Sequence, residues 1–103
     1  MGDVVPPDIT DNGTSTDTVA REGFNVSLQC HATGHPKPKI SWRREDGAPI
    51  AQGRFVGAWD GSELHLPVIS RHQMGAYLCI ASNSVPPSVS KRIVLNVHCT
   101  SIF

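Results

Sequence analysis

Five histidines and three cysteines are the residues of this chain best able to ligate a metal ion or act in catalysis. Such chemistry needs a constellation, such as a nucleophile beside a histidine and an acid, or several ligands at fixed spacing. No histidine pair has that spacing with an acid nearby, and no glycine-rich phosphate loop follows a strand and opens a helix. We therefore expect no enzymatic activity, no metal and no cofactor. The histidines, expected at the surface, are His31, His35, His65, His72 and His98.

Two of the cysteines fall in segments that alternate like strands. Side chains in a strand point to opposite sides in turn, so "MGAYLCIASN" places Tyr77 and Cys79 on one face. In "FNVSLQCHA" the same period places Leu28 and Cys30 on one face. A buried cysteine needs a partner, and Cys30 is the natural one for Cys79. A bridge closing a loop of about 50 residues would stabilise the fold by roughly 4 kcal/mol in the chain-entropy treatment.

A tryptophan lies between these cysteines. In "PKISWRR", Ile40 and Trp42 share one face and Arg43 lies on the opposite one. A cysteine, a tryptophan about a dozen residues later and then Tyr-x-Cys are typical of an immunoglobulin sandwich, in which a disulfide joins two sheets and the indole packs on it. The tyrosine hydroxyl of that fold bonds back to the corner before its strand.

Short alternating runs separated by turn residues continue along the chain, and no segment has a sustained helical period. We predict an all-β, immunoglobulin-like two-sheet antiparallel sandwich of the I-set type over residues 3–98, with one inter-sheet disulfide and residues 99–103 as a tail. Its core is expected to include Leu28, Ile40, Trp42, Leu64, Leu66 and Tyr77. The expected strands cover residues 6–10, 16–20, 24–32, 38–43, 54–59, 62–68, 75–83 and 88–98.

Two consecutive prolines stand in "VVPP" at residues 4–7. Proline cannot donate to a sheet ladder but favours an extended, stiff backbone. This segment is therefore either the start of an edge strand or a stiff linker to a preceding domain.

Nine basic and nine acidic residues cancel, and no basic block stands out. This balance favours neither nucleic acid nor an anionic membrane surface as a partner. We interpret "KPK" and "WRR" as solvent-exposed. No run approaches the roughly 20 apolar residues of a membrane span, and no signal-peptide core follows Met1. We expect no membrane insertion of this domain and regard the chain as part of a larger protein.

The compartment is indicated by the cysteines and by two acceptor sequons. A disulfide implies an oxidising environment. "NGT" and "NVS" make Asn12 and Asn25 candidate glycosylation sites, and Asn25 is the better one because alternation turns it outward. The sequence thus predicts an extracellular domain.

The sequence also predicts a surface that could bind a partner. If Tyr77 and Cys79 face inward, Leu78 and Ile80 face outward, and Arg43 and Val94 join them on the same sheet. Grouped aliphatic side chains on a solvent face often mark a contact with another domain or protein. The alternative is that a sugar or the stem of an arginine covers them.

Several segments resemble a known group of proteins: "REGFNVSLQC", "ATGHPKPKISWRRE" and "MGAYLCIASNSVPPSVSKRI". They are similar to the second immunoglobulin domain of neuronal cell-surface proteins of the lachesin and IgLON group, and most similar to the DPR-interacting proteins. The resemblance implies a three-domain ectodomain held at the membrane for selective adhesion between neurons, with DPR-like immunoglobulin proteins as partners. It implies that the first domain makes the principal contact and that this domain supports and spaces it.

Two features depart from the pattern. The corner of these domains usually carries an aspartate four residues before the tyrosine, paired with an arginine; here that position is Gln73, so Arg54 lacks this ionic partner. Cys99 is left as an odd cysteine, which we interpret as part of the tail or as a free thiol.

One alternative belongs to a different class. Intracellular immunoglobulin domains of giant muscle filament proteins share the sheet pattern and the tryptophan but act as elastic spacers in a reducing compartment. The oxidation state of the cysteines separates the two hypotheses.

Overall fold

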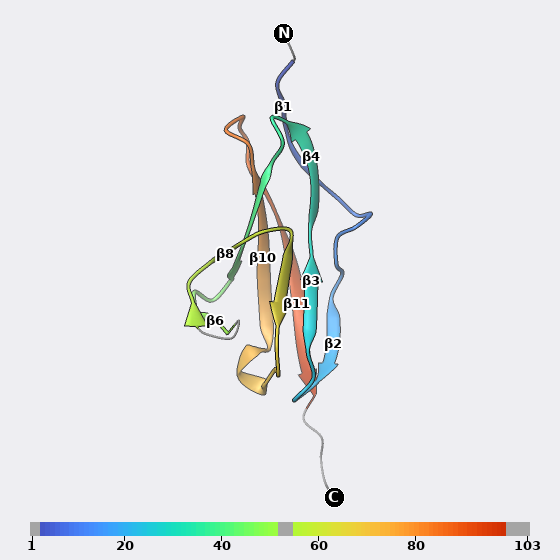
Figure 1. The fold of residues 1–103 in the computed structure, drawn as a ribbon, viewed down its shortest axis with the longest axis vertical. Coiled ribbons are helices and arrows are strands. Elements are labelled where there is room, and N and C mark those ends of the chain that lie inside the picture. Colours follow the sequence, from blue (N-terminus) through green and yellow to red (C-terminus); the bar gives the residue numbers. More distant parts are fainter. Residues whose placement is uncertain (1–2, 52–54, 99–103) are drawn as a thin grey trace, which may run out of the picture.

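The computed structural model describes residues 3–51 and 55–98, and it shows two packed β layers (Figure 1). One layer is a five-stranded sheet in the order β2-β11-β10-β5-β8. Its strands are β2 (Thr18–Arg21), β11 (Val89–His98), β10 (Gly75–Ser82), β5 (Lys39–Arg44) and β8 (Trp59–Asp60). The described residues contain one short helical turn, η1 (Arg71–Gln73). The predicted all-β sandwich is confirmed.

The other layer consists of shorter pairings. β1 pairs with β4 and β3 pairs with β9, while β6 and β7 form a separate pair. These strands are β1 (Val5–Thr10), β3 (Val26–Gln29), β4 (His31–His35), β6 (Ile50–Ala51), β7 (Phe55–Val56) and β9 (Glu63–Leu66). The expected strand 24–32 is thus divided at Cys30, and the expected strand 54–59 is replaced by β7 and β8 in its described part. The pair β6–β7 was not predicted, because two-residue strands carry no readable period.

One pairing differs from the expected antiparallel arrangement. β2 runs parallel to β11, whereas the other pairings in the described chain are antiparallel. The cause is a crossing between layers at the edge. After β1 the chain turns, and Thr14 accepts a hydrogen bond from the backbone N of His31 at 2.9 Å. The chain then crosses to the five-stranded sheet, where β2 runs parallel to β11.

The two prolines lie inside the edge strand β1. The pairing of β1 with β4 shifts register between Val5 and Asp8, so the prolines occupy an irregular part of the ladder. This placement agrees with the edge-strand interpretation, since a proline without an N–H is tolerated where pairing is interrupted.

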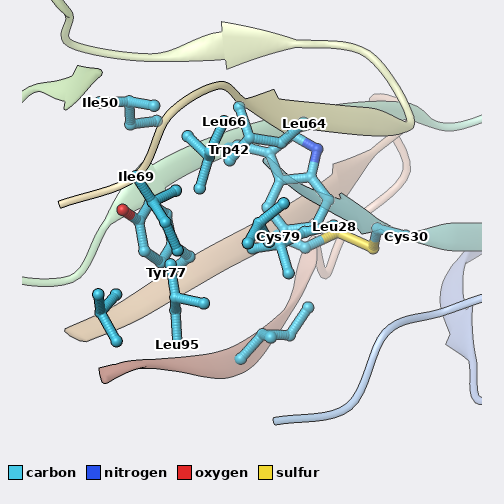
Figure 2. Packing of buried hydrophobic residues seen from close by; sticks show 13 residues of the cluster. Leu28, Cys30, Trp42, Ile50, Leu64, Leu66, Ile69, Tyr77, Cys79 and Leu95 are labelled. Carbon is cyan, nitrogen blue, oxygen red and sulfur yellow. A yellow bond between two sulfur atoms is a disulfide. The ribbon is translucent and has the colours of Figure 1, made fainter. Parts of the chain in front are cut away.

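The core lies between the layers and surrounds a disulfide. Cys30 and Cys79 are bonded, with 6.5 Å between their Cα atoms, and they join β10 to the β3–β4 strand of the other layer. The Trp42 side chain lies against this bridge beside Leu28 and Leu64 (Figure 2). Its indole Nε1 donates to the carbonyl of Gly61 at 2.8 Å, which satisfies the one polar group of the ring.

The structure places the six expected core residues on the inward side, with one difference of degree. Five are fully buried and Ile40 is half-buried at the edge of the cluster. The cluster extends further along β11 and the β9–η1 turn. The further aliphatic residues of the cluster are Val26, Ile50, Ile69, Ile93, Leu95 and Val97.

Candidate recognition surface

A hydrogen-bonded corner precedes β10 and fixes which way its side chains point. The Tyr77 hydroxyl donates to the carbonyl of Gln73 at 2.8 Å, as the tyrosine of this fold should. The Gln73 side chain accepts from the backbone N of Ser70 at the start of η1. Gln73 therefore acts as a neutral cap where related domains carry an aspartate. Arg54, expected to lack the ionic partner, lies outside the described residues.

Arg44 completes this corner, and the expectation that "WRR" is solvent-exposed is wrong for this residue. Its side chain is only 7% exposed. Its two terminal nitrogens donate to the carbonyls of His72 and Met74, each at 2.8 Å. Its guanidinium carbon lies 5.5 Å from the centre of the Tyr77 ring. The signal was available in the sequence, because Arg44 follows Trp42 by two residues and so faces the same way.

Burial of this corner changes the acidity of the tyrosine. Desolvation raises the pKa of Tyr77 above its ordinary value of 10.0. The charge of Arg44 acts in the opposite direction, and Asp46 raises the pKa a little further. The phenol therefore stays protonated and can keep donating to Gln73 over the whole physiological range.

The opposite face of β10 carries the candidate surface, in three rows set by strand register. Leu78 lies between Arg43 on β5 and Arg92 on β11. Ile80 lies between Ser41 and Ser90. Val94 lies opposite Ala76. The structure thus brings Arg43, Leu78, Ile80 and Val94 onto one solvent-facing sheet.

These aliphatic side chains are only partly exposed. Leu78, Ile80 and Val94 are half-buried, whereas Arg43 is exposed. The Arg92 Nε bonds to the Glu45 carboxylate at 2.8 Å, which holds a second arginine on the same sheet. The surface is therefore an aliphatic strip with fixed charges beside it, a mixture suited to a specific polar–apolar contact.

The two sequon asparagines are accessible. Asn12 is exposed in the turn after β1, and Asn25 is exposed just before β3. The Asn25 Oδ1 accepts from the backbone N of Val68 at 2.9 Å. A sugar is attached through Nδ2, so this hydrogen bond is compatible with glycosylation at Asn25.

The histidines make ordinary polar contacts. The Nδ1 of His31 lies 2.9 Å from the Thr10 hydroxyl, and that of His65 lies 3.0 Å from the Ser27 hydroxyl. Across residues 3–51 and 55–98, no three His, Cys, Asp or Glu side chains gather as metal ligands would. In the same part of the chain, no helix is long and apolar enough to cross a bilayer.

Comparison with known proteins agrees with this geometry. The family model described as the immunoglobulin domain matches residues 6–83. The chain belongs to the immunoglobulin domain family. Lachesin of Schistocerca americana is 37% identical to this immunoglobulin domain over 93 residues, which are 90% of the chain and 26% of lachesin. Protein amalgam of Drosophila melanogaster is 45% identical over 80 residues, covering 76% of the chain and 22% of amalgam. The domain thus spans about a quarter of these relatives.

Solved structures give stronger similarity. The crystal structure of Dpr2 Ig1-Ig2 in complex with DIP-Theta Ig1-Ig3 contains a chain 58% identical to this domain, with a TM-score of 0.90, covering 92% of this domain and 33% of that chain. The crystal structure of DIP-gamma IG1+IG2 is 50% identical to this domain, with a TM-score of 0.88. The match covers 92% of this domain and 49% of that chain. A titin Z1Z2 chimera is 21% identical with a TM-score of 0.73, which shows a shared fold alone.

Proposed function

We propose that residues 3–98 are the second immunoglobulin domain of a neuronal cell-surface receptor, an extracellular and non-catalytic module of an ectodomain that recognises other cell-surface immunoglobulin proteins. The observation that carries this proposal is the 50–58% identity over 92% of the domain to chains from DIP structures, two of them complexes with Dpr proteins. The domain covers 33% of the chain from the Dpr2 and DIP-Theta complex, which fits one of three immunoglobulin domains. It covers 49% of the DIP-gamma chain, which fits one of two.

The surface chemistry supports recognition as the activity. The described residues offer an aliphatic strip flanked by arginines on the β5–β10–β11 sheet, with Leu78 between Arg43 and Arg92. Such a surface can bind a protein by complementarity of shape and charge. In this proposal the first domain makes the principal contact with a DPR-like partner, and this domain supports it and adds the strip as a secondary contact.

The geometry of the chain supports a role as a spacer as well. β1 begins at one end of the long axis and β11 ends at the other (Figure 1). A domain entered and left at opposite ends can hold its neighbours in line, which sets the distance of the first domain from the membrane.

The intracellular elastic alternative has weaker support. The titin structures are 20–21% identical to this domain, a level that reflects the fold. The two hypotheses also differ in redox state. Thiol titration of the unreduced protein should find one free cysteine of the three in an extracellular domain, and three in a cytosolic one. Secretion with a sugar on Asn25 would further support the extracellular location.

The decisive experiment is a binding screen of the full ectodomain against other cell-surface immunoglobulin proteins, repeated with this domain deleted. We expect a DPR-like partner to bind the full ectodomain, and we expect the deletion to weaken binding without abolishing it. An ectodomain that binds no immunoglobulin protein would refute the proposal. Abolition of binding by the deletion would assign the principal contact to this domain instead.

A further inference from the structure

We propose that Phe24 and Val68 form an apolar seat for the immunoglobulin domain that follows this one in the same ectodomain, and that this seat fixes the angle between the two domains. The inference rests on the proposed function, in which this domain has a neighbour on its carboxyl side. It concerns one end of the sandwich, away from the sheet face described above.

Phe24 and Val68 are unusual in being large, apolar and open to solvent. Phe24 is 61% exposed and Val68 is 69% exposed. They belong to two turns that are far apart in sequence but joined by hydrogen bonds. The Ile69 N–H donates to the Phe24 carbonyl at 2.9 Å, and the Gly23 N–H donates to the Ile69 carbonyl at 2.7 Å. These hydrogen bonds join the turns that carry Phe24 and Val68, and we call this pair of turns the platform.

Val68 is also held in a strained conformation. Its φ is 46°, in the left-handed region that β-branched residues rarely adopt. Its N–H donates to the Asn25 side chain at 2.9 Å, which helps to keep the turn in this shape. A strained backbone that presents an exposed aliphatic side chain has no benefit for this domain alone. Strain of this kind is typical of positions that serve a contact.

The platform lies where the last strand leaves the domain. The Glu22 N–H donates to the carbonyl of His98, the final residue of β11, at 2.9 Å. The turn that contains Phe24 is thus bonded to the exit of the chain, at the end opposite to the start of β1 (Figure 1). A domain connected through this exit would be the first body to meet the two side chains.

The rim and the size of the platform also fit a domain joint. Glu22 and Arg71 form an ion pair at 3.5 Å beside the apolar pair, which gives a polar border. Contacts between domains of one chain bury about 600–1,500 Å². One buried phenylalanine supplies about 150–250 Å². Since Phe24 is 61% exposed, about 90–150 Å² of it remains to be buried, which is roughly a sixth to a quarter of a joint of about 600 Å², so its loss should be measurable.

The experiment uses the complete ectodomain carrying Val68→Gly or Phe24→Ser. Glycine adopts the φ of position 68 without strain, so Val68→Gly removes the side chain while leaving the turn intact. Val4→Gly is the matched control, because Val4 is 66% exposed but lies at the opposite end. Nitrogen-15 relaxation measures whether this domain and the next tumble together, and calorimetry measures the Tm of this domain.

We expect the wild type and Val4→Gly to show a single rotational correlation time for the two domains. We expect Val68→Gly and Phe24→Ser to lose this common tumbling, with the Tm of this domain in Val68→Gly equal to or above that of the wild type. Common tumbling retained in both variants, or absent from the wild type, would overturn the proposal. The proposal would also be overturned if the wild type formed a dimer that Phe24→Ser dissociates. The same holds if the two domains lose their common tumbling only when the Asn25 sugar is removed.

Partner binding of the same ectodomains separates this inference from the proposed function. If no immunoglobulin protein binds the wild type, the recognition proposal fails while the tumbling data still decide the joint. If binding is present and both variants tumble as the wild type does, the joint fails and the recognition proposal stands.

Discussion

The two faces of β10 differ sharply although they come from the same eight residues. Tyr77 and Cys79 on the inward face have no exposure, whereas Leu78 and Ile80 on the outward face are half-buried. The inward residues join two layers through a disulfide and a tyrosine corner. The outward residues are paired in rows with residues of β5 and β11. The inward side of the strand carries stability, and recognition is proposed for the outward side, so substitutions should separate the two.

The largest effect is expected from Trp42→Ala on the inward side. The substitution empties the volume beside the disulfide and removes the hydrogen bond to Gly61. Large-to-small changes of this type cost about 3–5 kcal/mol in the free energy of unfolding. Urea denaturation should show a strongly lowered unfolding midpoint, because small domains have only about 5–15 kcal/mol in total. Near-wild-type stability would show that the indole does not fill the core.

Removing the disulfide should lower the free energy of unfolding by a similar but slightly smaller amount. Cys30 and Cys79 are separated by 49 residues in the sequence. Replacing both by alanine should lower the free energy of unfolding by about 4 kcal/mol, since the bridge restricts the unfolded chain. Cys99→Ala is the control and should leave the unfolding midpoint unchanged. A double variant as stable as the wild type would mean that the bridge contributes no net stability.

The tyrosine corner should show a smaller, pH-dependent effect. Tyr77→Phe removes the bond to Gln73 and should cost about 1–2 kcal/mol. The pKa of Tyr77 is raised in the folded state, so the folded protein holds its proton more tightly than the unfolded chain. The resulting stability is present below pH 10 and is lost as the pH rises above that value.

This alkaline loss has a clean optical signature, because the chain contains a single tyrosine. Tyrosinate absorbance should rise only as the domain unfolds, and the stability of Tyr77→Phe should not share the same decline above pH 10. A titration of the folded domain at the ordinary tyrosine pKa would contradict the burial of the hydroxyl.

The same contrast explains what the sequence could and could not predict. Period-two alternation was sufficient for the core strands and for Trp42 and Cys79, because burial on one face dictates residue type. For Arg44 the alternation indicated the inward side, but no local pattern reveals the two loop carbonyls that satisfy its guanidinium, so its burial was not predicted. Alternation also missed Phe24 and Val68, since turn residues have no period and their exposure is fixed by hydrogen bonds between distant loops. Tertiary contacts of this kind lie beyond alternation.

The smallest effect on stability, and the sharpest test of the outward side, is expected from Ile80→Asp. The new carboxylate would lie between Ser41 and Ser90, with Asp60 one strand further along the same row. The free energy of unfolding should fall by no more than about 1 kcal/mol, because Ile80 is only half-buried while aspartate is a poor strand residue. Ser90→Asp places the same charge in the same row without removing an aliphatic side chain. If the strip is a partner contact, surface plasmon resonance on the full ectodomain should show about tenfold weaker binding for Ile80→Asp than for Ser90→Asp. Equal affinities for the two variants would mean that any change comes from the charge and not from loss of the aliphatic side chain. The outward face of β10 would then not contact the partner, and this domain would act only as a spacer for the first domain.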